Sequence, residues 1–372
     1  MEYMTGELCD GTTPYSAFKE NEGKVVSIKG AIHNIRDMSD FAFIILRTAR
    51  DTVQCVYSPE FSDYRLKENV VEQASAKITG KVVKSQTRDG SERFELQIHN
   101  IEILSTPAAI PPVVISKRKV NCDLNVDLDY RPVTLRNPSE RAVFKIQEGI
   151  QRGFREYLSK NGFTEIHTPK INFAGAEGGT NVFKLDYFGK TVFLAQSPQL
   201  YKQALVPVYE RVFEIGPVFR AEHHDTSRHL NEYISMDFEM GFIDSFTDIM
   251  EMETGVLKYI MDLLKREYAN EIELLKVDIP VIDKIPCIRF KDAKELCVKK
   301  LKNITDMKDF EPEEEAFLGK WAKQQYDSDF LFVTHYLSKK RPFYTMDDPE
   351  DPEVTLSFDL LFRGIETKGS GR

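Results

Sequence analysis

The stretch from Val212 to Met240 constrains the fold of this chain more than any other. Its first part, VFEIGPVF, is apolar and β-branched or aromatic like a buried strand, whereas EYISMDFEM alternates polar and apolar residues. The loop between them is rich in polar and charged side chains, namely Arg220, Glu222, His223, His224, Asp225, Arg228 and His229. Arginine offers a planar fork of donors that matches phosphate oxygens. The stretch therefore predicts an antiparallel strand pair that cradles a polyphosphate.

The composition is typical of an intracellular globular protein. With 372 residues, 41% of them hydrophobic, the chain is long enough for about two or three domains. A net charge of −9 argues against bulk, sequence-blind binding of nucleic acid, but it permits a specific nucleic-acid surface. The five cysteines form no CxxC pair, which disfavours a disulfide framework or a zinc site. Since neither a membrane span nor a signal peptide is present, we expect a cytoplasmic protein with no membrane contact.

The first part of the chain predicts a small β-barrel. Residues 1–22 are expected to be a polar lead-in. Between residues 23 and 105 lie five strand-like runs, KVVSIKGAIHNI, FAFIILRTA, TVQCVYS, AKITGKVVKS and FELQIHNIEILS. Five short strands with glycines at Gly30 and Gly80 favour a Greek-key barrel of the OB type, with a generic β-sandwich as the alternative.

A linker and a second domain are expected to follow. Residues 106–137 contain several prolines and a basic SKRK cluster, which is either a solvated patch or a contact to an RNA backbone. Residues 138–372 begin with a long helix capped by Ser139, whose apolar side chains recur at helical spacing at Val143, Ile146, Ile150, Phe154 and Leu158. A strand with Pro169 follows, and Ser197 caps a later helix. The expected fold class is α+β.

Several motifs, in order, resemble those of class II aminoacyl-tRNA synthetases of subclass IIb. The long helix with its proline-bearing strand resembles motif 1, FRAE within the strand pair resembles motif 2, and RGIE closes the strand that precedes motif 3. Finer matches are similar to aspartyl-tRNA synthetases of the eukaryotic and archaeal type: AEGGTNVF, FLAQSPQLYKQ, FEIGPVFRAE and RPFYTM. This resemblance implies an OB-type anticodon-binding barrel and a catalytic domain built on a mainly antiparallel sheet flanked by helices.

The resemblance also implies a site for ATP and Mg²⁺. Arg220 matches the arginine that bridges the α-phosphate and the substrate carboxylate, and Glu222 matches the residue that accepts from the adenine amino group. Further ATP-binding positions are Arg228, His229, Leu230 and Tyr233. Glu366 matches a carboxylate that holds Mg²⁺ between the phosphates. His223 and His224 receive no role, because a zinc site would need companion carboxylates.

The choice of amino-acid substrate is expected to depend on the cation of Lys202. Lys202 suits the carboxylate side chain of aspartate, and Asp237 accepts from the substrate ammonium or orders the cationic residues. Gln199 and Glu177 match further contacts to the amino acid. Asparagine would leave the cation of Lys202 without a counter-charge, which gives discrimination without editing.

The resemblance assigns tRNA(Asp) as the macromolecular partner. Phe43 would stack on a splayed anticodon base, and Gln54 would hydrogen-bond a base edge. Motif 1 implies a homodimer, for which the apolar stripe of residues 139–160 and Pro169 are suitable, although they could equally belong to a monomer core.

Several alternatives stay open at this point. The sequence contains no motif 3 after Glu366, and the spacing of Ser370 and Arg372 does not fit the expected turn. The chain is therefore either part of an active enzyme, which we favour, or inactive as printed. Rival functions are a non-catalytic paralogue that binds tRNA or protein, an asparaginyl- or lysyl-tRNA synthetase, and an ammonia-dependent asparagine synthetase, which lacks the barrel. Charging of tRNA(Asn), the source and membership of a multi-synthetase complex are not decided by the sequence.

Overall fold

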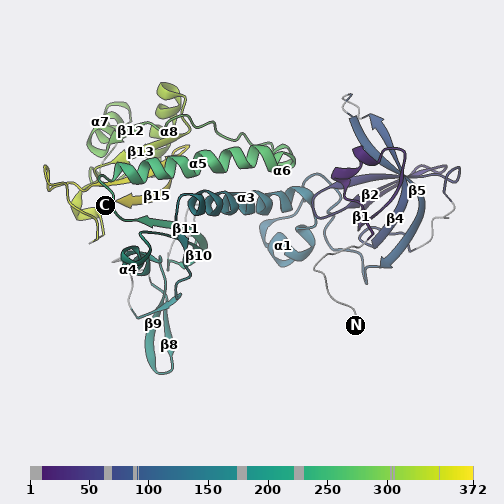
Figure 1. Ribbon diagram of the computed structural model, residues 1–372, viewed down its shortest axis with the longest axis horizontal. Coiled ribbons are helices and arrows are strands. Elements are labelled where there is room, and N and C mark those ends of the chain that lie inside the picture. Colours follow the sequence, from purple (N-terminus) through teal and green to yellow (C-terminus); the bar gives the residue numbers. More distant parts are fainter. Residues whose placement is uncertain are drawn as a thin grey trace. The chain divides into compact units, whose positions relative to one another are not determined.

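The computed structural model divides the chain into two compact units, Met1–Arg141 and Ala142–Arg372 (Figure 1). It describes residues 11–62, 69–86, 90, 92–173, 182–221, 230–301, 304, 306–342 and 344–371, with backbone only for residues 368–371. Each unit has a hydrophobic core of its own.

The first unit is a closed five-stranded barrel, which confirms the predicted OB type. Its strands pair in the order β1-β2-β3-β5-β4. All pairs are antiparallel except β3 with β5. The strands are β1 (Val25–Asp37), β2 (Ala42–Arg47), β3 (Thr52–Tyr57), β4 (Ser75–Gln86) and β5 (Glu92–Ser105).

Alternation along the strands fills the barrel. In β2, Ala42, Ile44 and Leu46 are fully buried, while the intervening side chains face outward. The described part of the lead-in also contributes to this core. Two 3₁₀ turns, η1 (Tyr15–Ala17) and η2 (Lys19–Asn21), flank Phe18, which packs among the barrel side chains with no exposed surface.

Asn137, rather than Ser139, caps the long helix α3 (Pro138–Lys160). The Asn137 Oδ1 accepts from the backbone N–H of Ser139 at 2.9 Å and of Glu140 at 3.3 Å. Its amide nitrogen donates to the carbonyls of Ile115 and Lys117. Asn137 thus joins the linker to the helix, and the sequence prediction of a Ser139 cap was wrong. Two short helices, α1 (Leu124–Asp129) and α2 (Arg131–Thr134), precede it.

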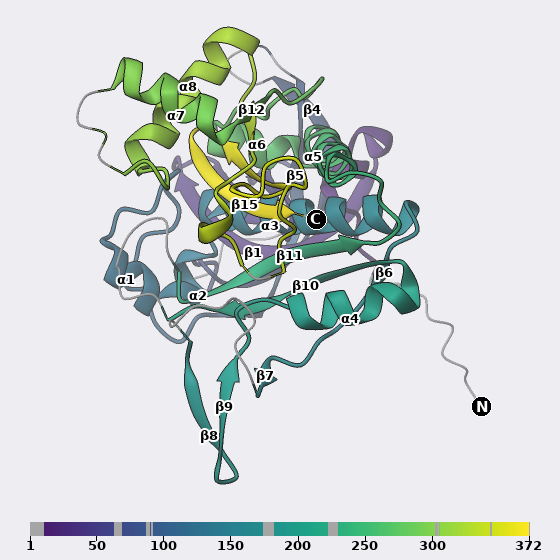
Figure 2. The ribbon, with the colours of Figure 1, turned by 90° about the vertical axis from the view of Figure 1, so that its left-hand side faces the viewer.

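The described strands of the second unit form three small sheets. The strand pair β10 (Arg211–Phe219) and β11 (Glu232–Met240) is joined in parallel by β6 (Thr164–Glu165). A second sheet has the order β12 (Cys287–Arg289), β13 (Phe330–Thr334), β14 (Ser357–Phe362) and β15 (Ile365–Gly371). The third is formed by β7 (Ile171–Asn172), β9 (Lys190–Leu194) and β8 (Lys184–Tyr187), and β8 and β9 form a projecting hairpin (Figure 2).

Helices cover these sheets. Besides α3 they are α4 (Gln199–Tyr209), α5 (Thr247–Glu267), α6 (Ala269–Leu275), α7 (Phe290–Lys300) and α8 (Pro312–Tyr326), with a 3₁₀ turn, η3 (Ser338–Lys340). The helices α3 and α5 run side by side (Figure 1), and a Cβ at Gly153 would lie 2.9 Å from Ile260 Cγ1. The glycine therefore permits this close approach. In the described residues, we find no helix with the length and apolar character needed to cross a membrane.

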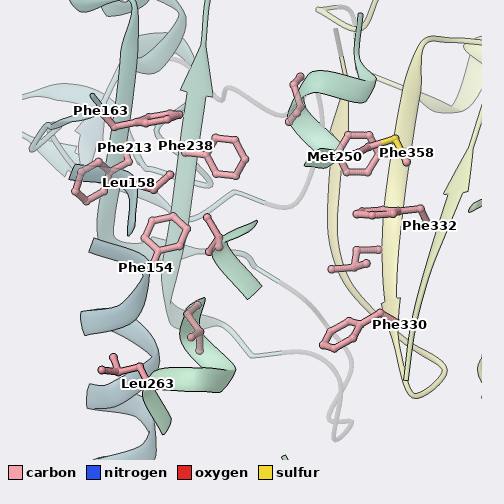
Figure 3. Close-up of a cluster of buried hydrophobic side chains, with 14 of the residues drawn as sticks. Phe154, Leu158, Phe163, Phe213, Phe238, Met250, Leu263, Phe330, Phe332 and Phe358 are labelled. Carbon is pink, nitrogen blue, oxygen red and sulfur yellow. The ribbon is translucent and has the colours of Figure 1, made fainter. Parts of the chain in front are cut away.

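Aromatic side chains connect the long helix with the central strands. Phe154 of α3 meets the ring of Phe213 edge-on at 5.9 Å, and Phe163 meets Phe238 at 5.8 Å (Figure 3). Each fully buried side chain of this size contributes about 1.5–3 kcal/mol. The predicted stripe on α3 is only partly buried, since Val143 is 52% exposed. The core therefore fixes β10 and β11 through the C-terminal half of the helix.

A polar cluster lies at the end of β2 in the barrel. The buried His33 ring accepts at Nδ1 from Arg47 Nη1 at 3.0 Å. Burial and the positive charges of Arg47 and Arg141 lower the pKa of His33 to about 4. The folded state therefore holds this imidazole neutral across the range in which a free histidine becomes charged.

Stability should accordingly depend on pH through His33. Its pKa is lowered in the folded state, so the unfolded chain binds the proton first, and stability falls as pH drops below about 6.5. When pH is lowered by one unit from that value, we expect the free energy of unfolding of the wild type to fall by about 1 kcal/mol more than that of His33→Asn. Urea unfolding of both proteins at two pH values measures this difference. Equal losses would contradict the neutral assignment.

Candidate active site

The predicted strand pair is present along its full length. β10 and β11 pair in antiparallel register from Arg211 opposite Met240 to Phe219 opposite Glu232. Side chains of β11 at alternate positions share one face, which brings Tyr233, Ser235, Asp237 and Glu239 into one row. This row lines a cavity of about 1180 Å³ in the second unit.

A buried cation, Lys202 of the helix α4, lies beside this row. Lys202 is 5% exposed, and its Nζ lies 3.2 Å from Asp237 Oδ1 and 3.9 Å from Glu239 Oε2. Ser235 Oγ donates to the other oxygen of Asp237, and Gln199 Nε2 donates to Glu239 Oε2 at 3.2 Å. The ammonium group is thus fixed by carboxylates on the neighbouring strand. The helix begins at Gln199 with Pro198 in the cap position, so the prediction of Ser197 as the cap was wrong by one residue, although Ser197 Oγ accepts from the Gln199 N–H at 3.1 Å.

The other candidate residues of the strand pair divide into two groups. Arg220, Leu230 and Tyr233 line the same cavity as Gln199, Lys202 and Asp237. The backbone N–H of Arg220 donates to the Asn231 carbonyl at 3.0 Å, which continues the ladder beyond β10. The remaining predicted positions lie outside the described residues; these are Glu177, Glu222, Arg228 and His229.

The opposite wall of the cavity carries a second cluster. Arg341 Nη2 lies 2.7 Å from Asp359 Oδ2, and the guanidinium carbon lies 3.9 Å from the centre of the Tyr336 ring. Asp359 is 5% exposed and stands on β14 among apolar residues. Glu315 of α8 and Glu366 also line the cavity. Sequence reasoning missed Arg341 and Asp359, although an aspartate inside the apolar run SFDLLF was a usable signal.

Glu366 lies in the negative field of this cluster. Although part of its surface is still open to solvent, partial removal from water and the charges of Asp359 and Glu315 raise the pKa of Glu366 to about 7. Arg341 opposes this shift. Carboxylates that are not fully neutralised by protein cations are suitable partners for a hard cation.

A pre-built metal cage is not part of this arrangement. Within the described residues, no group of three or more His, Cys, Asp and Glu side chains is placed to hold a metal ion. Magnesium is commonly bound by one or two carboxylates together with phosphates of the substrate. The carboxyl of Glu366, which lines the cavity near the carboxylates of Asp359 and Glu315, fits that mode of binding.

The predicted anticodon residues lie on the outer face of the barrel. Ile45 is paired with Gln54, and Phe43 lies two residues earlier on the same outward side of β2. The ring of Phe43 meets Phe41 edge-on at 5.3 Å, and Gln54 Nε2 donates to Glu95 Oε1 at 2.7 Å. An outward aromatic beside a fixed amide is a suitable surface for single-stranded bases.

Known sequences and structures show the same organisation. Residues 123–372 match the family model described as tRNA synthetases class II (D, K and N), and residues 26–104 match an OB-fold nucleic acid binding domain. The chain belongs to the class II tRNA synthetases. It is 43% identical over 359 residues to the aspartate–tRNA(Asp/Asn) ligase of Deinococcus radiodurans, covering 95% of this chain and 80% of that relative. It is 35% identical over 361 residues to the aspartate–tRNA(Asp) ligase of Pyrococcus abyssi, covering 95% of this chain and 81% of that relative.

Solved structures of class II synthetases superpose over almost the whole chain. The aspartyl-tRNA synthetase of Entamoeba histolytica matches with a TM-score of 0.82 and 25% identity, covering 100% of this chain and 81% of that one. The asparaginyl-tRNA synthetase of Pyrococcus horikoshii, complexed with asparaginyl-adenylate, matches with a TM-score of 0.81 and 26% identity. This match covers 93% of this chain and 79% of that one. The shared fold thus includes relatives named for aspartate and for asparagine, two amino acids whose side chains differ by one functional group.

The Arg341–Asp359 pair should behave as a buried ion pair. Removing the cation alone in Arg341→Met leaves a buried carboxylate and should cost about 3–5 kcal/mol of unfolding free energy. Adding Asp359→Asn should recover part of this loss, giving a coupling energy of about 1–3 kcal/mol in a double-mutant cycle measured by urea unfolding. Strict additivity of the two single substitutions would contradict the pairing.

Proposed function

We propose that this protein is an aspartate–tRNA ligase. It activates L-aspartate with ATP to give aspartyl-adenylate and pyrophosphate, and then transfers the aspartyl group to the 3′-terminal adenosine of tRNA(Asp). The observation that carries this proposal is the buried Lys202 ammonium beside Asp237 in the large cavity. Family membership and the aspartate ligases among the relatives support it.

The activation step is proposed to depend on positioning. The α-carboxylate oxygen of aspartate attacks the α-phosphorus of ATP, and the bond to the pyrophosphate oxygen breaks. Arg220, at the end of β10, would contact both the α-phosphate and the attacking carboxylate, so that two anions are held together. Glu222, Arg228, His229, Leu230 and Tyr233 are the proposed additional ATP contacts. When bound, Mg²⁺ would neutralise phosphate charge, with Glu366 as the residue that holds it.

Specificity for aspartate is proposed to come from Lys202. The side-chain carboxylate of the substrate would pair with its Nζ, while Asp237, Gln199 and Glu177 would contact the remaining polar groups. Asparagine would present a neutral amide to this buried cation in place of a carboxylate, and mismatches of this kind give strong discrimination.

Lys202→Met tests this specificity directly. We expect aspartate-dependent ATP–pyrophosphate exchange by the full-length protein to fall by about 10²–10³, because a preorganised charge is removed. Lys291→Met, at an exposed position on α7, is the matched control and should keep the wild-type rate. Intact aspartate activation by a folded Lys202→Met protein would refute the assignment.

The barrel is proposed to read the anticodon of tRNA(Asp) through Phe43 and Gln54. Phe43→Ala should raise KM for a tRNA(Asp) transcript while leaving ATP–pyrophosphate exchange unchanged, because stacking on an aromatic contributes about 1–3 kcal/mol per base. Aminoacylation of tRNA(Asp) and tRNA(Asn) transcripts measures both this effect and the breadth of tRNA choice. An unchanged KM would exclude Phe43 as a stacking platform.

Two further features complete the proposal. The protein is proposed to act in the cytoplasm and to form a homodimer through α3 and the strand region around Pro169. Exposed apolar residues on the first turns of α3, Val143 at 52% and Phe144 at 46%, support such an interface. Light scattering of the full-length protein should give twice the mass of one chain, and a monomer mass would contradict this.

A further inference from the structure

The barrel unit contains a second cavity that the proposed chemistry does not use. Its volume is about 590 Å³. Its walls are formed by Ala31, Arg47, Gln73, Ser75, the run from Ser105 to Pro112, Val133 and Arg136. Among these described lining residues two are arginines and none is acidic. The cavity is therefore positively charged.

Arg47 is held in place by neutral groups. It is 8% exposed, its Nη1 donates to His33 Nδ1 at 3.0 Å, and its Nη2 donates to Gln73 Oε1 at 3.2 Å. These bonds orient the guanidinium without cancelling its charge. Burial, together with the positive charges of Arg141 and Arg136, lowers the pKa of Arg47 to about 10. The carboxyl of Asp51 interacts with Arg141. Burying charge in this way costs free energy unless an anion compensates.

The backbone around Arg47 is also costly. His33 lies at an irregularity of β1 between Ile32 and Asn34, where a bulge re-aims its side chain. Gln73 has φ of 71°, a left-handed conformation that is unfavourable for a side chain of this kind. Its Nε2 is buried without a hydrogen-bond partner among the described residues. Costly local features of this kind concentrate at functional sites.

The position of the cavity indicates its ligand. Arg47 and Phe43 project from the same outer side of β2, since they are four residues apart on one strand. At about 3.3 Å per residue, their Cα atoms are roughly 13 Å apart. An RNA strand whose base stacks on Phe43 could therefore bring its backbone to the mouth of the cavity, where Arg136 is exposed.

We propose that this cavity binds a phosphate group of RNA that lies along the outer face of β2, with Arg47 and Arg136 as the cations. The inference rests on the proposed function, in which tRNA is the macromolecular substrate. Ser75, Ser105 and Thr106 would supply neutral donors beside the arginines. The alanine and proline side of the cavity would face the sugar.

Two substitutions test the site without removing Arg47. Gln73→Glu places a carboxylate beside Arg47 Nη2 and supplies the missing counter-charge, while Arg136→Gln removes the exposed cation. Lys81→Gln, at an exposed position on β4, is the matched control for loss of one charge from the barrel. The probe is an anticodon stem-loop RNA of tRNA(Asp), titrated against the full-length protein at several salt concentrations.

We expect Gln73→Glu and Arg136→Gln each to raise Kd for the stem-loop by about tenfold. The slope of log Kd against log salt should fall by about 0.7, as for the loss of one single-strand phosphate contact. Lys81→Gln should change both quantities less. Gln73→Glu should unfold at the same temperature as the wild type or a higher one, which shows that its effect is not misfolding.

Two results would overturn the proposal. The first is that Gln73→Glu and Arg136→Gln both keep the wild-type Kd and the wild-type slope of log Kd against log salt. The second is a site for free anions only, in which inorganic phosphate at matched ionic strength raises Tm of the wild type but not of Arg136→Gln, while RNA affinity is unchanged. Aspartate-dependent ATP–pyrophosphate exchange separates this failure from failure of the proposed function. If exchange is retained while neither cavity substitution changes the affinity for RNA, the phosphate site is refuted and the proposed function is not.

Discussion

The ion pair between Lys202 and Asp237 is the interaction on which the account of this protein depends. A lysine that is 5% exposed is tolerated in its charged form only with fixed anionic partners, and those partners lie on β11. The strand must therefore be held rigidly against α4. Its antiparallel partner β10 supplies the backbone ladder, and Phe213 and Phe238 anchor the pair in the core beneath the site (Figure 3). The alternation of one strand thus serves packing on one face and lines the cavity with polar side chains on the other.

A second part of the cavity lining is rich in carboxylates. Partial removal from water and the negative charges of Asp359 and Glu315, which Arg341 offsets only in part, raise the pKa of Glu366 to about 7. The turn before Glu366 is placed by a close backbone contact, since a Cβ at Gly319 would lie 2.3 Å from the Gly364 nitrogen. The cations Lys202 and Arg220 and the carboxylates Glu315 and Glu366 line the same cavity, and such a mixed lining is suited to a substrate that brings phosphates and a metal ion.

The sequence predicted the elements with strong periodicity. Alternation in β11 and the five strand-like runs of the barrel led directly to the observed sheets. The cap of α3 could not be predicted as well, because Ser139 and Asn137 both suit a cap, and only the linker carbonyls that Asn137 also binds decide between them. Arg341 and Asp359 were missed for a similar reason. Their pairing joins segments 18 residues apart, so the aspartate inside the apolar run SFDLLF marks one partner, but no local pattern identifies the other. Phe18 was missed since a single aromatic in a polar run gives no period.

The most direct test of the central claim is the choice between two adenylates. Calorimetry with non-hydrolysable analogues of aspartyl-adenylate and asparaginyl-adenylate compares ligands that differ only in the group facing Lys202. We expect the aspartyl analogue to bind at least about 10² times more tightly, because only its side-chain carboxylate brings a negative charge to the buried Lys202 ammonium. Equal affinity, or a preference for the asparaginyl analogue, would contradict this role of Lys202.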